Sequence, residues 1–187
     1  MKVKVNESTL ELVVGDITKQ ETEAVVNAAN NRLAPGGGVA GAIHRAAGPE
    51  LWEECKKLGG CETGQAKLTR GYRLPASYVI HTVGPVYSGL SEDAKLLESC
   101  YRESLQLARE RGIKSISFPA ISTGIFGYPV EEAAKIALKT IVDALRETPN
   151  IQLVRLVLRD SDTLRVHEKA LKLLMTELDE EWNRGNQ

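Results

Sequence analysis

The chain has 187 residues, with 24 Lys and Arg against 25 Asp and Glu and a formal net charge of −1 at pH 7. This length fits one domain with enough apolar residues to form a buried core. Because the charges balance, no overall field draws the protein toward nucleic acid or an anionic membrane, and we expect neither as a partner. Any bound anion has to be held by local geometry.

The N-terminal residues MKVKVNESTLELVVGD alternate in the manner of a strand and lack the basic start and apolar core of a secretory signal. The longest apolar runs are also too short to cross a bilayer. Cys55, Cys61 and Cys100 form no CxxC pair, which is typical of reduced thiols. We therefore expect a cytoplasmic protein.

Apolar residues along the chain recur with a period that switches between two and about 3.6, the pattern of alternating strands and helices. In chain order it predicts strand Leu10–Val14, strand Glu23–Asn27, helices Ala40–Ala47 and Pro49–Leu58, strand Tyr78–Val83, helix Glu92–Arg111, strand Ser115–Pro119, helix Val130–Glu147, strand Leu153–Leu158 and helix Thr163–Trp182. The segments Thr69–Ala76 and Gly84–Asp93 are expected to be loops. The strands are mostly too apolar to have a solvated face, so we expect an α/β fold with helices on both sides.

One domain spanning residues 1–187 is expected, with its core at about residues 8–178 and a flexible tail at 179–187. No exposed apolar stripe stands out, which favours a monomer.

Small and polar residues gather just after the predicted strands, where open α/β sheets bind their ligands. Asp16 and Ile17 follow the first strand, and Asp16 can cap the next turn or accept a hydrogen bond from an exocyclic amine such as that of adenine. Asn27 and Asn30 lie at the end of the second strand. Asn27 can fix the loop backbone, whereas the amide of Asn30 is suited to sugar hydroxyls.

Two glycine-rich segments follow predicted strands: GGGVAGAIHRAAG at residues 36–48 and STGIFG at residues 122–127. The first contains G-x-G-x-x-G, but it does not leave its strand directly, and no acidic strand end follows about 20 residues on, as a dinucleotide fingerprint requires. A P-loop is excluded because no Gly-Lys-Ser/Thr occurs. Glycines still let a diphosphate approach the backbone, and a helix starting near Val39 offers free amides. The two loops together predict a clamp for one diphosphate.

Other reactive side chains are sparse. His44, His81 and His167 are scattered without metal-ligand spacing, so we expect neither a metal nor a cofactor. Ser122 lacks the G-x-S-x-G elbow of serine hydrolases. Any catalysis would depend on positioning and on the substrate's own groups. A Rossmann-type oxidoreductase is a minor alternative.

The ordered segments GDIT, VNAANN, GGGVAGAIHRAAGPEL, YVIHTVGP and FPAISTGIFGYP lie between about Leu12 and about Asp160, and this set resembles a macro domain. The chain is similar in particular to the MacroD-type branch, whose members bind ADP-ribose and often hydrolyse its ester links to acidic side chains or acetate. The resemblance implies a three-layer α/β/α sandwich with a mixed, mostly parallel sheet of about six strands.

The resemblance also implies a role for each matching position. Asp16 would hold the adenine amine, with Ile17 beside the ring. Asn27 and Asn30 would meet the distal ribose, Asn30 more directly. The first diphosphate loop would contain Gly37, Gly38 and Val39. The second would contain Ser122, Thr123, Gly124, Ile125 and Phe126, with Phe126 also packing on the distal ribose.

Two positions depart from the MacroD-type pattern. The family segment reads G-V-D-G-A-I-H, with an aspartate thought to orient or activate water at the distal ribose, and this chain has Ala40 there. Many relatives carry an aromatic residue that stacks on adenine after the last strand, where this chain has Arg159, whose guanidinium plane could stack instead.

The resemblance therefore implies a hydrolase of ADP-ribosyl esters, weakened at position 40, whose catalytic set is Asn30, position 40 and Phe126. Its substrate would be ADP-ribosylated protein or O-acetyl-ADP-ribose. A non-catalytic ADP-ribose-binding module is the alternative.

Overall fold

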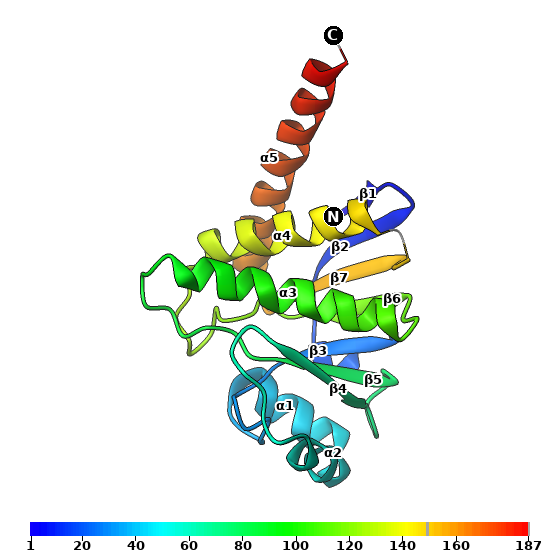
Figure 1. The fold of residues 1–187 in the computed structure, drawn as a ribbon, viewed down its shortest axis with the longest axis vertical. Coiled ribbons are helices and arrows are strands. Elements are labelled where there is room, and N and C mark those ends of the chain that lie inside the picture. Colours follow the sequence, from blue (N-terminus) through cyan, green and yellow to red (C-terminus); the bar gives the residue numbers. More distant parts are fainter. Residues whose placement is uncertain (149, 187) are drawn as a thin grey trace.

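A mixed β-sheet runs through the middle of the molecule, with helices on both faces (Figure 1). The computed structural model describes residues 1–148 and 150–186, and within these residues the sheet has seven strands. The strands are β1 (Lys2–Val5), β2 (Ser8–Val14), β3 (Ala24–Ala28), β4 (Ala66–Arg70), β5 (Tyr78–Thr82), β6 (Ser115–Phe118) and β7 (Leu153–Leu158).

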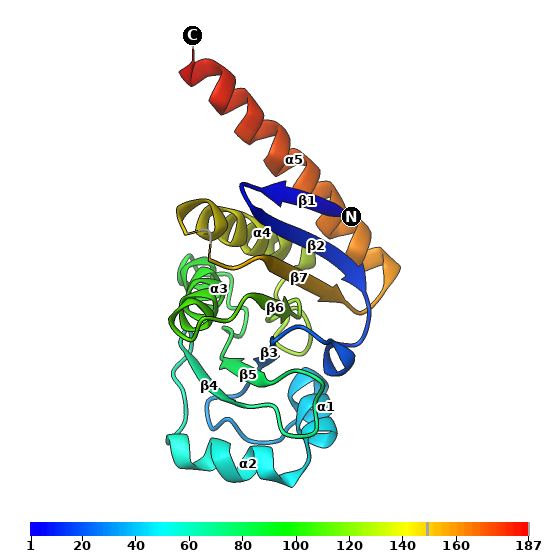
Figure 2. The same cartoon turned by 90° about the vertical axis from the view of Figure 1, so that its right-hand side faces the viewer.

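The strand order across the sheet is β1-β2-β7-β6-β3-β5-β4, which can be followed from top to bottom in Figure 2. All pairs from β2 to β5 are parallel, and only the two edge strands, β1 and β4, pair in the antiparallel direction. The carboxyl ends of five strands therefore meet along one edge of the sheet, the edge at which α/β folds bind ligands. This arrangement confirms the predicted α/β fold with a mixed, mostly parallel sheet.

Two sequence predictions about the sheet need correction. The sheet has seven strands in the described residues and not about six, and β4 occupies the start of the segment Thr69–Ala76 that was predicted as a loop. The apolar pattern does not predict β4, whose sequence is AKLTR, because an edge strand is half solvated. Three of its five side chains are only partly buried, so it lacks a long apolar run.

Five α-helices lie in the described part of the chain: α1 (Gly38–Ala47), α2 (Pro49–Cys55), α3 (Glu92–Glu110), α4 (Val130–Glu147) and α5 (Ser161–Gly185). Short 3₁₀ turns occupy Ile17–Lys19 and Lys56–Leu58. Four of the five α-helices differ from the predicted ranges by one to three residues at an end, and α4 matches its range. Helix α5 continues to Gly185, so the predicted end at Trp182 was too early.

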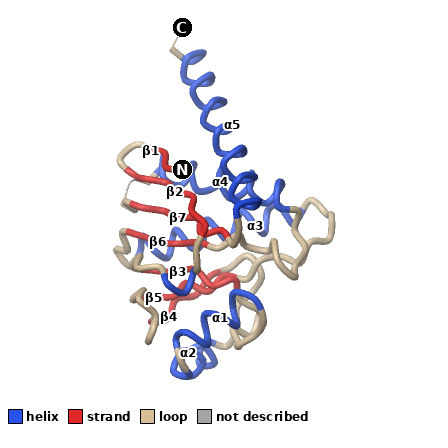
Figure 3. The backbone as a smooth tube through the Cα atoms, turned by 180° about the vertical axis from the view of Figure 1, so that it is seen from behind, coloured by secondary structure: helices blue, strands red, loops and turns tan. Residues whose placement is uncertain are grey.

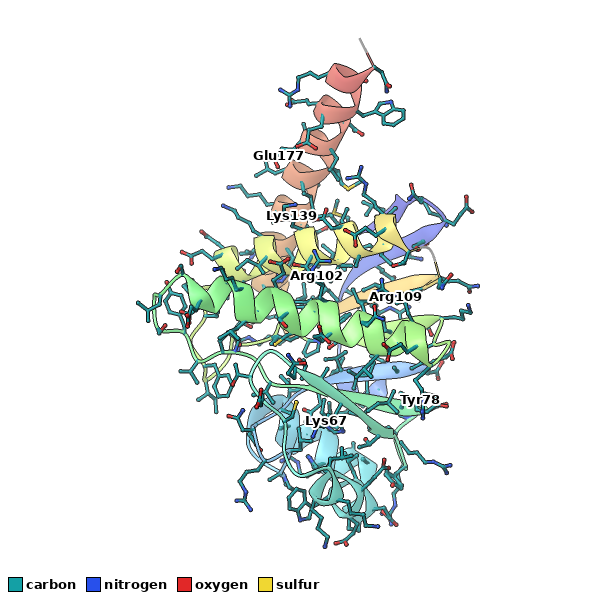
Figure 4. All side chains as sticks on the ribbon, in the orientation of Figure 1. Lys67, Tyr78, Arg102, Arg109, Lys139 and Glu177 are labelled. Atoms are coloured by element: carbon teal, nitrogen blue, oxygen red, sulfur yellow. The ribbon has the colours of Figure 1, made fainter. Side chains whose placement is uncertain are left out.

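Helices α3 and α4 lie side by side on one face of the sheet, whereas α1 and α2 cover the other face beside β3, β5 and β4 (Figures 2 and 3). Helix α5 packs against α4 and β2 and projects beyond the body of the molecule (Figure 1). Arg102 of α3 forms an ion pair with Glu147 at the end of α4, with 3.7 Å between the guanidinium and the carboxylate, and so links the two helices (Figure 4). The same guanidinium lies 3.2 Å from the carboxylate of Glu98, one turn earlier on α3.

Alternation along the strands divides the core into two layers. In β3, Val26 packs with Phe118 and Ile141 beneath α3 and α4, while its neighbour Val25 packs with Ile43 beneath α1 and α2. Each central strand thus buries both faces, which explains the nearly continuous apolar runs of the sequence. Of the helices in the residues described, none combines the length and apolar character needed to span a membrane.

Candidate functional site

A cavity of about 520 Å³ opens at the carboxyl ends of the parallel strands. It lies between the start of α1, the loop that joins β6 to α4, and the end of β7. Its lining residues are Ala28, Ala29, Asn30, Gly36, Gly37, Gly38, Val39, Ala40, Pro119, Ala120, Ser122, Thr123, Gly124, Ile125, Phe126, Val157, Arg159 and Thr163. The structure thus brings both predicted glycine loops, Asn30, Ala40 and Arg159 to one cavity.

The first loop is braced by the side chain of Asn30. Its amide nitrogen donates to the carbonyl oxygen of Ala34 at 2.8 Å, and its carbonyl oxygen accepts from the amide of Ala34 at 3.0 Å. Each end of this side chain keeps further capacity, one N–H and one lone pair. Asn30 therefore shapes the loop while it faces the cavity.

Close packing between Gly36 and Gly41 sets the path of the chain into α1. A β-carbon on Gly41 would lie 2.2 Å from the carbonyl oxygen of Gly36, so only glycine fits there. Gly37 is the N-cap residue and provides no side-chain cap. The first amides of α1 have no partner within the helix and lie at its positive end, beside the cavity.

The second loop has a strained turn at Ser122. This residue has a φ of +67°, a region that costs a residue with a side chain about 1–3 kcal/mol. Its hydroxyl donates to the carbonyl oxygen of Pro85 at 2.8 Å, and its carbonyl oxygen accepts from the amide of Tyr128 at 2.9 Å. A β-carbon on Gly84 would lie 2.2 Å from the Ser122 hydroxyl, so the segments fit only with glycine there. The hydroxyl of Ser122 is therefore committed to the loop.

The two loops face each other across the cavity. The Cδ1 atom of Ile125 lies 3.9 Å from the position of a β-carbon on Gly37, and the Ile125 side chain is 86% exposed. The bonds that close the second loop use the amides of Gly127 and Tyr128 and not those of Ile125 and Phe126. Among the described residues, the amides of Ile125 and Phe126 therefore have no backbone partner and are available to a ligand.

The far end of the cavity is lined by Val157, Arg159 and Thr163. The first two lie at the end of β7, and Thr163 lies in the first turn of α5, where the carboxylate of Asp160 caps the helix by accepting from the Thr163 amide at 2.8 Å. Val157 and Thr163 are not among the predicted site residues, because no local pattern indicates that a strand residue and a helix residue share a cavity.

Asp16 and Ile17 do not line the cavity, although they lie at the same sheet edge, just after the pairing of Val14 with Leu158. The Asp16 carboxylate accepts from the hydroxyl of Thr18 at 2.7 Å and from its amide at 2.9 Å. These bonds lower the pKa of Asp16, the side-chain bond most. The predicted capping role of Asp16 is confirmed, and its contact with adenine stays a prediction.

Asn27 is fully buried and does not line the cavity, and its contact with a ribose stays a prediction. Asn27 lies opposite His81 in the parallel pair of β3 and β5. Its amide nitrogen donates to Nδ1 of His81 at 3.0 Å, which puts the ring proton on Nε2, 2.8 Å from the Thr69 hydroxyl. Asn27 is thus part of the support for the strand end.

A second buried histidine lies beside this network. His44 is on α1, one turn after Ala40, and its ring centroid is 6.5 Å from that of His81. Within the described residues neither ring nitrogen of His44 has a hydrogen-bond partner. Burial lowers the pKa of His44, and burial with the neighbouring His44 lowers that of His81 to about 3. Both imidazoles are therefore neutral at pH 7.

Among the residues that line the cavity, Arg159 alone carries an ionisable side chain. No carboxylate is present to repel an anion, and no side chain in the lining can act as a general base at neutral pH. In residues 1–148 and 150–186 no group of three or more His, Cys, Asp or Glu side chains is placed to hold a metal ion. The chemistry of the cavity is that of backbone amides, one asparagine and one arginine.

Residues 26–137 match the family model of the macro domain. A macro domain-containing protein of Methanosarcina mazei is 51% identical over 176 residues, which are 94% of this chain and 94% of that protein. The ADP-ribose glycohydrolase MACROD2 of Xenopus laevis is 59% identical over 135 residues, 71% of this chain but 32% of that protein. A variant of the Oceanobacillus iheyensis macrodomain solved with ADPR is 45% identical, with a TM-score of 0.91 over 94% of this chain and 98% of the other.

The family model spans both glycine loops, and the fold agrees with that of the Oceanobacillus iheyensis macrodomain over 94% of this chain. The chain belongs to the macro domain family, close to the MacroD-type ADP-ribose glycohydrolases.

Proposed function

We propose that this chain binds ADP-ribose in the cavity and hydrolyses esters that join ADP-ribose to an acidic side chain or to acetate. The observation that carries the proposal is that both glycine loops line one cavity and come within reach of each other at Gly37 and Ile125. A related macrodomain was solved with ADPR, and related proteins are named ADP-ribose glycohydrolases.

The diphosphate fits between the two loops. The helix dipole of α1 and the free amides of its first turn favour an anion, and the lining has no carboxylate to oppose one. The adenine would lie toward Val157 and Arg159, and the distal ribose would lie toward Asn30 and Phe126. The Arg159 side chain is 71% exposed, and its Nε atom lies 3.6 Å from the Asp160 carboxylate. This surface ion pair still allows the guanidinium plane to stack on the adenine ring.

Hydrolysis in this cavity depends on the position of a water molecule. We place this water between the diphosphate and Asn30, with the substrate's own phosphate as proton acceptor, because the lining contains no other base. The water attacks the anomeric carbon or the ester carbonyl, a new C–O bond forms, and the ester C–O bond breaks. Free ADP-ribose and a carboxylate leave, and the surplus proton passes to solvent. Positioning and the loop amides supply the rate enhancement.

A pure ADP-ribose-binding module is the second candidate, and Ala40 is the observation that favours it. Ala40 lines the cavity beside the proposed ribose site, and its methyl group can neither orient nor deprotonate water. Binding by the loops would be unaffected by this residue, because it uses backbone amides.

Two measurements test the proposal. Calorimetry should show saturable binding of ADP-ribose, and no binding at millimolar ligand would overturn both candidates. Incubation with a protein mono-ADP-ribosylated on glutamate should release ADP-ribose above the rate without enzyme. Binding without release would reject the hydrolase and leave the binding module.

A further inference from the structure

An uncharged, apolar surface borders the cavity at the end where the distal ribose is proposed to lie. Its exposed apolar side chains are Val86, Tyr87, Leu90 and Ile125, with exposed fractions of 63%, 37%, 68% and 86%. We call these four residues the rim. The segments that carry them, GPVYSGLS at 84–91 and SISFPAISTGIFGYPV at 115–130, contain no charged residue.

Hydrogen bonds join the rim to the cavity wall. The amide of Tyr87 donates to the carbonyl oxygen of Phe126 at 2.8 Å, and Pro85 accepts from the Ser122 hydroxyl at 2.8 Å. Val86 lies between these two anchored residues. The Tyr87 and Tyr128 rings are 4.9 Å apart, which adds a packing contact. In Figure 1 the connection before α3 and the connection before α4 lie on the same side of the molecule.

Hydrogen bonds also hold the part of the rim near Leu90, which lies farther along the chain from the cavity wall. The Asp93 carboxylate, in the first turn of α3, accepts from the amides of Ser88 at 2.8 Å and Gly89 at 2.9 Å. The exposed apolar side chains of Val86 and Leu90 thus lie on a loop that hydrogen bonds keep ordered. Exposed aliphatic groups on an ordered, uncharged surface at the mouth of a cavity are typical of contact sites for other molecules.

We propose that the rim binds apolar side chains of the polypeptide that carries the ADP-ribosyl group, next to the modified acidic residue. This inference rests on the proposed function. With the distal ribose placed toward Phe126, a group joined to that ribose lies next to the loop whose Tyr87 amide bonds the Phe126 carbonyl oxygen. An acetyl group is too small to cover the rim, whereas a peptide extends over it. The rim therefore selects among modified polypeptides by the residues that flank the modification.

The test uses two synthetic peptides that carry ADP-ribose through an amide link, which an ester hydrolase leaves intact. One has leucine and valine beside the modified residue, and the other has serine and glycine. The protein should bind the apolar peptide about fivefold more tightly, as partial burial of two aliphatic side chains gives. The double variant V86S/L90S should lose this preference and keep its affinity for free ADP-ribose. L173S, an exposed position on α5 remote from the cavity, is the matched control and should keep the preference.

The outcomes separate the two proposals. Equal affinity for both peptides in the native protein, together with normal binding of free ADP-ribose, would reject the proposed role of the rim and leave the proposed function intact. A preference that survives in V86S/L90S would also reject that role. If free ADP-ribose does not bind, both the proposed function and the proposed role of the rim are rejected. Thermal unfolding of each variant checks that the exposed substitutions leave the fold unchanged.

Discussion

The carbonyl oxygen of Gly36 lies 2.2 Å from the place that a β-carbon would take on Gly41. The G-x-G-x-x-G spacing of this chain therefore reflects a backbone contact between the first loop and α1. The contact holds the loop against the helix whose first amides face the cavity, and so the binding site depends on it.

The substitution Gly41→Ala should damage both the fold and the site. The added methyl group has to displace the backbone of Gly36, and such overpacking costs about 1–3 kcal/mol. Thermal unfolding should show a lowered Tm, and calorimetry should show weaker binding of ADP-ribose. Gly124→Ala is the control for stability, because nothing lies within 4 Å of its β-carbon position. Equal Tm values for the two variants would contradict the close contact.

Asn30→Ala should weaken ADP-ribose binding about tenfold. The variant loses both hydrogen bonds to Ala34, each worth about 1 kcal/mol, and with them the shape of the first loop. Asn31→Ala is a matched control, since Asn31 donates to the carbonyl oxygen of Cys61 at 3.0 Å and does not line the cavity. We expect native affinity for the control. Similar losses in both variants would mean that Asn30 has no special role.

Ala40→Asp should raise the rate of ester hydrolysis at least tenfold, with little change in ADP-ribose affinity. A positioned base contributes about 10²–10⁴-fold, and position 40 lines the cavity. His44 lies one turn away on the same buried side of α1 and has no hydrogen-bond partner in the described residues, so it can support the new carboxylate. Ala40→Asn, which has no ionisable group, should remain slow. An unchanged rate in Ala40→Asp would show that activity is not limited at this position.

Stability should fall as the pH drops below about 6.5, and His81 should account for much of the fall. Burial lowers the pKa of His81 to about 3 in the folded protein, whereas the unfolded chain binds the proton near pH 6.5. The unfolded state therefore takes up more protons between these values. The free energy of unfolding decreases by about 1.4 kcal/mol for each pH unit through this one group.

Urea unfolding at pH 7, 6, 5 and 4.5 measures this slope. His81→Gln should be less stable at pH 7 but should have a slope smaller by about 1.4 kcal/mol per pH unit. The aspartates with lowered pKa values, Asp16, Asp93 and Asp160, lose their contributions only below about pH 4, outside this range. Parallel pH profiles for the two proteins would contradict a neutral, buried His81.

The spacing of apolar residues in the sequence predicts most of the helices and strands. The helix Val130–Glu147 and the strand Leu153–Leu158 coincide with α4 and β7, because a long apolar stripe or a short apolar run is visible without tertiary information. Small and polar residues after the strands also located the cavity, since the carboxyl ends of parallel strands have to meet at one edge. Eleven of its lining residues, including both glycine loops, Asn30 and Ala40, are among the site residues that the sequence and its resemblance to the macro domain predict.

Tertiary structure alone decided which of these residues reach the cavity. Asn27 and Asn30 have the same side-chain chemistry, but the pairing of Asn27 with His81 across two strands buries the first, whereas the second faces the cavity. Val157 and Thr163 line the cavity because the end of β7 and the start of α5 lie next to the glycine loops. The Ser122 hydroxyl donates to the carbonyl oxygen of Pro85, a residue distant in sequence, and so it is not available to a ligand. Side-chain direction at these positions depends on strand register and loop packing. Those are set by long-range contacts, which a local pattern of residues does not encode.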